Sequence, residues 1–276
     1  MDFEKAKARA ATENKDLFLV FTGSDWSKSC QRFEREILSE ESFQTTLSSQ
    51  FLLVRIDLPL RSNLPKEVKE AKRDLADRMV VDTWPTSVYL DAKGRPFYRE
   101  RGILSLKADK YAAHILVKQR ERTERDARLK AADQLEGMAR ASAIVKILET
   151  LPRESVLEFY PDQVADLERL DTEDSLGFLK QRRSEKALNE IERSLPKLFN
   201  HQSFDRLIKN VDDYLKVYQP EGELRQKALT FKMAAYENSA RPDEALKLAK
   251  EIVKSGPGTS LGKSAALVKK RLEARK

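Results

Sequence analysis

The sequence is poor in the residues on which much protein chemistry depends. It contains one cysteine and two histidines among 276 residues. A single cysteine excludes an internal disulfide, and it excludes the two-thiol cycle in which one thiolate attacks a disulfide and a second thiol resolves the intermediate. His114, His201 and Cys30 provide no cluster of metal ligands. We therefore predict no metal and no cofactor.

Long apolar runs are also missing. No stretch approaches the roughly 20 apolar residues that a membrane-spanning helix needs, so we expect no membrane span. The apolar fraction of 40% is enough for buried cores, and the 35% of charged residues predicts a soluble, helix-rich protein. A chain of 276 residues is long enough for two domains.

Excess positive charge is confined to one end of the chain. The net charge is +7, and residues 241–276 carry ten basic against four acidic side chains. Such a tail can attract nucleic acid or an anionic surface. Because it has neither interleaved aromatic residues nor a nucleic-acid-reading motif, a solvated helix face explains it better, and we do not expect a nucleic-acid partner.

The first residues, Met1 to Lys5, lack the basic and apolar segments of a signal peptide. As written, the sequence predicts a cytoplasmic protein. An export signal removed before Met1 would leave the same sequence and would place the protein in the periplasm or outside the cell.

Residues 3–101 alternate between helical and strand-like patterns. Leu17–Phe21 and Phe51–Leu58 have the length and apolar content of buried strands, and helical spacing over Lys28–Leu38 lies between them. Glu67–Met79 predicts another helix, and the two runs of residues 87–99 predict a hairpin. A short amphipathic helix over residues 3–13 precedes the first strand. The order is therefore a βαβ unit followed by a helix and an antiparallel hairpin, an α/β pattern.

This order and several motifs resemble the thioredoxin fold. Residues 26–30, Trp-Ser-Lys-Ser-Cys, resemble the thioredoxin active site Trp-Cys-x-x-Cys with a serine in place of the first cysteine. Residues 2 to about 121 are similar to the bacterial thioredoxin-like family that carries Gly-Ser-Asp-Trp-Cys before its second cysteine. The matched positions are Phe21-Thr22-Gly23-Ser24-Asp25-Trp26, Cys30, Thr83-Trp84-Pro85-Thr86 and Gly94.

The resemblance assigns roles to the two ends of the motif. In the family the first cysteine is the nucleophile, whose thiolate is stabilised by the helix N-terminus. Ser27 stands at that position, and since a hydroxyl without a general base is a poor nucleophile, we expect Ser27 to cap the helix. Cys30 stands at the resolving position. Its spacing from Phe33 favours a small buried residue, and a one-thiol chemistry is the alternative.

A second matched segment is Thr83-Trp84-Pro85-Thr86. It is similar to the cis-proline loop of thioredoxins, in which the residue before proline keeps its backbone free to pair with an extended peptide. A trans turn proline is the alternative. The resemblance places Trp26 and Trp84 at the same site, where an aromatic pair favours peptide binding. The predicted peptide-binding residues are therefore Trp26, Trp84, Pro85 and Thr86.

From Leu106 onward the sequence predicts helices alone, with punctuation at Pro152, Pro161, Pro196, Pro220, Pro242 and Pro257. Ala245, Ala249, Ile252 and Pro257 match the second half of a tetratricopeptide-like repeat. Leu207, Val211 and Tyr214 form a weaker copy, and Met233 occupies a position where the repeat usually has a small residue. A concave repeat that binds peptide and a plain helical bundle both fit this pattern. We predict a thioredoxin-like α/β domain over residues 1–121 and an all-α domain of degenerate helical hairpins over residues 122–276.

Two functional hypotheses follow. The first is a thioredoxin-fold protein with an incomplete redox site, which binds an extended peptide or a thiol-containing protein without dithiol turnover. The second is an enzyme, a protein thiol-disulfide oxidoreductase or isomerase, in which Cys30 acts alone and a low-molecular-weight thiol resolves the intermediate.

Overall fold

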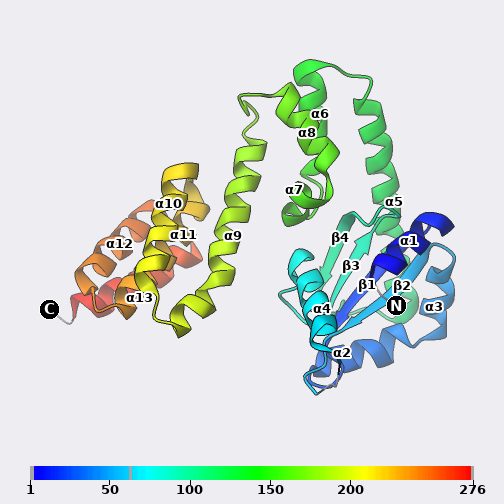
Figure 1. Ribbon diagram of the computed structural model, residues 1–276, viewed down its shortest axis with the longest axis horizontal. Helices are drawn as coiled ribbons and strands as arrows, with labels where there is room; N and C mark the ends of the chain where they lie inside the picture. The colour runs from blue at the N-terminus through cyan, green and yellow to red at the C-terminus, as the bar shows by residue number, and fades with distance from the viewer. Residues whose placement is uncertain (1–2, 62–63, 275–276) are drawn as a thin grey trace. The chain divides into compact units, whose positions relative to one another are not determined.

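The chain folds into two compact units. The computed structural model (Figure 1) describes residues 3–61 and 64–274. Along the chain, the boundary between the two units falls between Leu176 and Gly177. The first is a mixed α/β unit, and the second is entirely helical among its described residues. The outermost residues of the two predicted domains, 1–2 and 275–276, lie outside the described residues.

A four-stranded sheet forms the centre of the first unit. Its strands are β1 (Asp16–Thr22), β2 (Phe51–Asp57), β3 (Thr86–Leu90) and β4 (Pro96–Arg101), in the order β2-β1-β3-β4. β1 is parallel to β2 and antiparallel to β3, while β3 and β4 form the hairpin. Every residue of β1 is buried. The continuous apolar run at this position is therefore explained by a strand that is covered on both faces.

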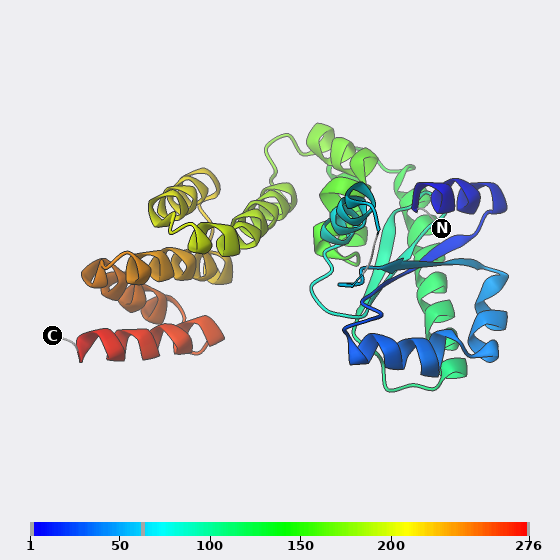
Figure 2. The same ribbon diagram turned by 60° about the horizontal axis from the view of Figure 1, so that its bottom comes forward.

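Helices cover both faces of this sheet. Figure 2 shows α1 (Phe3–Glu13) and α4 (Lys66–Arg78) on one side, and α2 (Lys28–Phe33) and α3 (Glu41–Ser48) on the other. On the latter side, rings from α2, α3 and α5 (Ala108–Ala132) pack with rings of the sheet. The Phe18 and Tyr89 ring centroids lie 5.2 Å apart, and Phe43 packs edge to face on Phe18 with centroids 5.8 Å apart. Tyr111 joins Phe33 and Phe43 from α5.

Two local features differ from the sequence prediction. The predicted helix over Lys28–Leu38 is α-helical only to Phe33, and it continues as a π-helical turn, η1 (Glu34–Leu38). Helix α3 was not predicted. Only Phe43 and Leu47 of its eight residues are buried, so its apolar signal is too short to distinguish from a loop.

The first unit extends well beyond residue 121, the end of the predicted α/β domain. Helix α5 runs through this position, and α6 (Gly137–Leu148), η2 (Arg153–Ser155), α7 (Val156–Phe159) and α8 (Pro161–Leu170) follow it within the same unit. Ion pairs attach these helices to the sheet region. Arg99 of β4 contacts Glu154 at 2.9 Å, and Arg78 of α4 contacts Glu158 at 2.6 Å.

The second unit contains five consecutive helices among its described residues: α9 (Phe178–Asn200), α10 (Phe204–Tyr218), α11 (Gly222–Asn238), α12 (Pro242–Ser255) and α13 (Ser260–Glu273). Figure 1 shows α10 to α13 as neighbouring helices that alternate in direction. All the residues that suggested a repeat are buried in the two cores of this unit, except Pro257. A helical domain is confirmed, and its repeat character stays a prediction.

The prediction that Pro196 separates two helices is wrong. Pro196 lies inside α9, which continues to Asn200. A proline within a helix removes one backbone donor and crowds the preceding turn, but here the helix ends one turn later, so few hydrogen bonds are affected.

Candidate functional site

The loop between β1 and α2 carries the motif residues, and the segment after β2 holds this loop in place. Ser24 donates to the Asp57 carboxylate twice, from its amide at 3.0 Å and from its hydroxyl at 2.6 Å. The Trp26 indole N–H donates to the carbonyl of Leu58 at 3.0 Å. Because β1 and β2 are parallel neighbours, the two segments leave the sheet at the same edge and meet there.

Asp25 makes a further connection to the same segment. Its carboxylate accepts from the amides of Leu60 and Arg61, at 3.0 and 2.7 Å. The Arg61 amide, followed by the Leu60 amide, holds the pKa of Asp25 below its ordinary value. Three consecutive residues, Ser24, Asp25 and Trp26, therefore bind the motif loop to the end of β2 and the segment after it. The sequence did not indicate these individual contacts.

Gly23 is required by the position of the Trp26 ring. A Cβ at Gly23 would lie 2.2 Å from Cε2 of Trp26. The ring thus covers the backbone at the start of the motif, and a larger residue would displace it.

The two tryptophans meet, as the sequence predicts from their loops. The Trp26 and Trp84 rings pack edge to face, with centroids 5.5 Å apart. Trp26 is 40% exposed and Trp84 is half-buried. They are the only two tryptophans of the chain, so an aromatic surface with one exposed ring lies at this edge of the sheet.

The segment around Pro85 leaves one backbone position open. The Trp84–Pro85 peptide bond is cis. The Pro85 carbonyl accepts from the Gly102 amide at 2.8 Å, whereas the Trp84 N–H and carbonyl have no hydrogen-bond partner among residues 3–61 and 64–274. Thr86 is fully buried, pairs with both neighbouring strands and donates its hydroxyl to the Thr83 carbonyl at 2.7 Å. Thr86 thus stabilises this segment through its hydrogen bond to Thr83, and its side chain is not exposed to solvent.

Ser27 caps α2. Its hydroxyl accepts from the Cys30 amide at 3.3 Å, and its own amide donates to the Gly23 carbonyl at 3.0 Å. The residue is 9% exposed. A hydroxyl engaged in this way satisfies one of the free amides of the first helical turn.

Cys30 is buried beneath the motif loop. Only 2% of the residue is exposed, and the Gly23 amide approaches Sγ at 3.4 Å. Burial agrees with the prediction of a small core residue beside Phe33, which is also buried.

Cys30 and the tryptophans line different hollows. The cysteine hollow, of about 410 Å³, is lined by Thr22, Ser24, Cys30, Gln31, Glu34, Arg35, Ser39 and Arg55. The tryptophan hollow, of about 270 Å³, is lined by Trp26, Trp84, residues 57–60 and 64, and side chains of α4. The structure therefore brings Trp26, Trp84 and Pro85 together and gives Cys30 a separate environment.

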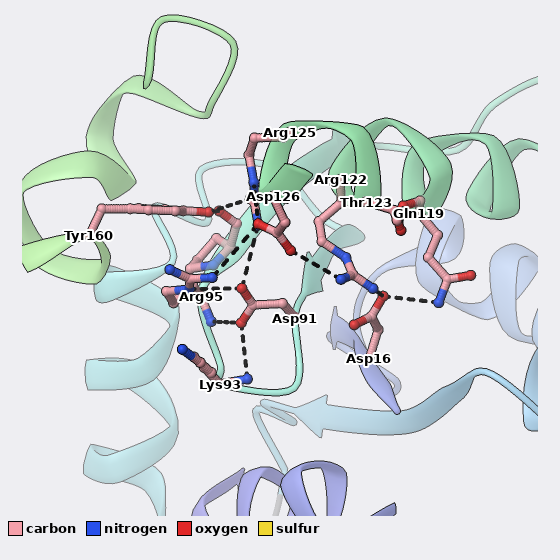
Figure 3. A network of polar contacts seen from close by, with 11 residues as sticks. Asp16, Asp91, Lys93, Arg95, Gln119, Arg122, Thr123, Arg125, Asp126 and Tyr160 are labelled. Atoms are coloured by element: carbon pink, nitrogen blue, oxygen red, sulfur yellow. Dashed lines mark hydrogen bonds and ion pairs between the residues drawn. The ribbon is translucent and has the colours of Figure 1, made fainter. Parts of the chain in front are cut away.

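A buried polar network occupies the opposite end of the sheet (Figure 3). Asp16 of β1 accepts from Arg122 at 2.8 Å, and the carboxylate of Asp91 accepts from Arg95 and lies 3.5 Å from Arg125. Burial raises the pKa of Asp16 in spite of the opposing charge of Arg122.

Tyr160 extends this network to the helices beyond residue 121. Arg125 donates to the Tyr160 hydroxyl at 2.6 Å, and that hydroxyl donates to the Pro96 carbonyl at 2.8 Å (Figure 3). Arg125 also binds Asp126, and these hydrogen bonds, with those from Arg122, lower the pKa of Asp126 although burial alone would raise it. The network joins four segments that are distant in sequence, and no local pattern in the sequence pointed to it.

Two further observations concern metal sites and membrane crossing. Within the part of the chain that the structure describes, no group of three or more histidine, cysteine, aspartate or glutamate residues is arranged to hold a metal ion. In the same part, no helix combines the length and apolar character that a membrane crossing requires.

A comparison with known protein families matches part of the first unit. A family model described as a thioredoxin-like domain matches residues 3–116. Residues 3–116 are a thioredoxin-like domain. The matched range contains the motif loop, both tryptophans, Pro85 and all four strands of the sheet.

Two curated relatives match part of the chain. The disulfide bond reductase DsbH of Chlamydia pneumoniae is 27% identical over 97 residues, which are 35% of this chain and 58% of that protein. The thioredoxin-related protein DsbJ of Chlamydia pneumoniae is 20% identical over 99 residues, which are 36% of this chain and 28% of that protein. The matches thus span 58% and 28% of the length of these two relatives, less than two thirds of either.

Among solved structures, a DsbH oxidoreductase is 23% identical, with a TM-score of 0.41. The similarity covers 43% of this chain and 81% of that structure.

Proposed function

We propose that the thioredoxin-like domain binds extended peptide segments of partner proteins at the surface formed by Trp26 and Trp84, next to the buried Pro85, without dithiol turnover. The observation that carries this proposal is the free backbone of Trp84, whose N–H and carbonyl have no partner among the described residues. An extended peptide can pair with such a position as an additional strand would.

The aromatic pair gives this backbone site a second source of affinity. Trp26 is 40% exposed beside the half-buried Trp84, so a peptide that pairs with Trp84 would also cover apolar ring surface. Burial of aromatic and aliphatic surface is favourable at about 25 cal/mol per Å². The surface needs no reacting group for this activity.

The motif itself argues against dithiol turnover. The chain has one cysteine, and Ser27, at the position of the missing nucleophile, uses its hydroxyl to cap α2. Cys30 is 2% exposed and lies outside the tryptophan hollow. The aromatic surface is therefore accessible to a bound protein, whereas the thiol is buried.

A titration monitored by tryptophan emission tests the proposal. Both tryptophans of the chain lie at the site, so a tryptophan-free peptide that binds there should change the emission of the full chain. The same peptide with N-methylated amides should bind at least about tenfold more weakly, because it cannot pair with the Trp84 backbone. Equal affinity of the two peptides would contradict the proposal.

Two variants complete the experiment. Trp84→Ala should weaken binding while Trp26 still reports it. Leu106→Ala is the control. Leu106 is an apolar side chain with the same 40% exposure as Trp26, and it lies outside both the tryptophan hollow and the cysteine hollow. A similar loss in both variants would indicate a nonspecific apolar effect.

Single-thiol exchange through Cys30 is the second candidate. The observation that favours it is the cysteine hollow, because Cys30 lines it beside Arg35 and Arg55. The relative DsbH is a disulfide bond reductase. In this reaction the Cys30 thiolate attacks a disulfide, one sulfur leaves as a thiolate, and a low-molecular-weight thiol then displaces Cys30 from the mixed disulfide.

Insulin reduction with dithiothreitol distinguishes the two candidates. Binding without turnover predicts the same rate for the natural chain and for Cys30→Ala. A faster rate in the natural chain would favour the enzyme. Iodoacetamide labelling gives an independent readout, and the burial of Cys30 predicts no modification without denaturant.

A further inference from the structure

Both apolar and charged side chains line the tryptophan hollow. Its lining includes Trp26 and Trp84 together with aliphatic side chains from two segments, namely Leu58, Pro59, Leu60, Leu64, Ala76 and Val81. The volume of about 270 Å³ is large enough for one bulky apolar side chain. The hollow adjoins the open backbone position of Trp84, so a peptide bound there has an apolar recess beside it.

Helix α4 supplies the positively charged side chains of the lining. Lys69, Lys72 and Arg73 line the hollow from neighbouring turns of this helix. The Lys72 ammonium donates to the main-chain carbonyl of Asp57 at 2.9 Å, a contact that leaves its charge without a carboxylate partner. Arg73 is exposed and forms no ion pair with any residue in the described ranges.

The carboxylates of the lining are engaged elsewhere. Asp57 binds the amide and hydroxyl of Ser24, and Arg55 lies 3.9 Å from it. Asp77 also lines the hollow and has interactions of its own. Three cationic and two anionic side chains thus line the hollow, which gives it a net positive charge, and Arg73 is the exposed cation without an ion pair among the described residues.

We propose that the tryptophan hollow selects extended peptides in which a bulky apolar residue is flanked, two positions away, by an acidic residue. The apolar side chain fills the recess between the tryptophans and α4, and the carboxylate pairs with Arg73. Residues two positions apart lie on the same face of an extended chain, about 7 Å apart, which places the acidic side chain near the charged side chains of the lining when its neighbour occupies the recess. This inference rests on the proposed peptide binding and adds the class of peptide.

Three tryptophan-free peptides of equal length test the selectivity. Each carries a central leucine among serines, with glutamate, glutamine or lysine at both positions two residues away. Titration into the full chain is monitored by tryptophan emission at low and at physiological salt. We expect the glutamate peptide to bind about twofold to fivefold more tightly than the glutamine peptide at physiological salt, and the lysine peptide to bind most weakly.

Two matched variants locate the effect. Arg73→Gln should abolish the preference for glutamate over glutamine while the glutamine peptide keeps its affinity. Lys66→Gln is the control, because Lys66 lies on the same helix, is 83% exposed at its side chain and does not line the hollow. It should retain the full preference.

The possible failures are distinguishable. If none of the peptides binds, or if binding is insensitive to Trp84→Ala, the proposed peptide binding fails and this inference fails with it. If the peptides bind with equal affinity, or if Arg73→Gln and Lys66→Gln lose the preference alike, peptide binding stands and the acidic selectivity is wrong.

Discussion

The two ends of the sheet in the thioredoxin-like domain differ in how far their polar groups are hydrogen-bonded. At the end where β1 leaves the sheet, the Trp84 backbone is unpaired among the described residues and the Trp26 ring is exposed. At the other end, Asp16 and Arg125 are almost fully buried and each has several partners. Satisfied polar groups hold segments together, whereas an open backbone position beside an aromatic surface is suited to a ligand.

The buried end should give the largest effect on stability. Arg125→Met removes a buried guanidinium that contacts Asp91, Asp126 and the Tyr160 hydroxyl. Breaking such a network costs about 3–5 kcal/mol. Chemical denaturation of the full chain, followed by circular dichroism, measures this loss in the transition of the first unit.

Arg128→Met provides the control for that prediction. Arg128 lies on the same helix, is exposed and forms no ion pair with the residues that the structure describes. Its replacement should change the unfolding free energy by less than about 0.5 kcal/mol. If the two variants were equally stable, the network would not be what attaches α5 and Tyr160 to the sheet.

The open end should respond to Gly23→Ala with a smaller loss of stability and a large loss of binding. The added Cβ would lie 2.2 Å from the Trp26 ring, which must move away from Leu58 and Trp84. Overpacking of this kind costs about 1–3 kcal/mol. The tryptophan emission should shift before any peptide is added. An unchanged spectrum with unchanged peptide affinity would show that the ring position does not matter for binding.

The helix cap predicts a smaller change. Ser27→Ala removes the acceptor for the Cys30 amide and should cost about 0.5–2 kcal/mol of stability. Peptide affinity should be retained, because Ser27 is buried and lies outside the tryptophan hollow. Ser27→Asp, which restores a capping acceptor, should recover part of the lost stability. If the Ser27→Ala variant is fully folded and still loses peptide affinity, Ser27 has a role beyond capping.

The smallest predicted effect concerns two carboxyl groups, one at each end. Amide hydrogen bonds lower the pKa of Asp25, and burial raises the pKa of Asp16. Carbon-13 NMR titration of the side-chain carboxyls should show Asp25 titrating below 3.8 and Asp16 above 3.8, the ordinary value for both. The reverse order would contradict the contrast between the two ends.

The same directions fix the sign of the pH dependence. The stability that Asp25 contributes is present above its unfolded-state pKa and is lost as the pH falls through the lower folded-state value. Asp16 behaves in the opposite way, since its protonated form is favoured in the folded chain. Its contribution is present at low pH and is lost as the pH rises through the folded-state value. Asp16→Asn should therefore weaken the pH dependence above pH 3.8.

Local patterns predicted the elements whose residues carry a clear period. The apolar run at β1, the helical spacing in α4 and the hairpin of β3 and β4 lie within one or two residues of their predicted bounds. The Ser27 cap was predicted because capping depends on residues three apart. Helix α3 was missed because only two of its side chains reach the core.

The contacts that the sequence did not reveal join residues far apart in the chain. Arg122 binds Asp16 across 106 positions, and Tyr160 binds the Pro96 carbonyl across 64. A helical pattern predicts α5, but it does not indicate which of its arginines faces a buried carboxylate. The separation of Cys30 from the tryptophan hollow was likewise hidden, because only three residues lie between Trp26 and Cys30, and this short spacing suggested one shared surface.

Peptide affinity in Cys30→Ala tests the central claim most directly. The titration uses the full chain, a tryptophan-free extended peptide and the emission of Trp26 and Trp84. If the domain binds without thiol chemistry, Cys30→Ala and the natural chain should have the same Kd within about twofold, since a twofold change corresponds to about 0.4 kcal/mol. Binding by the natural chain with none by Cys30→Ala would contradict the account and make Cys30 the functional group of the site.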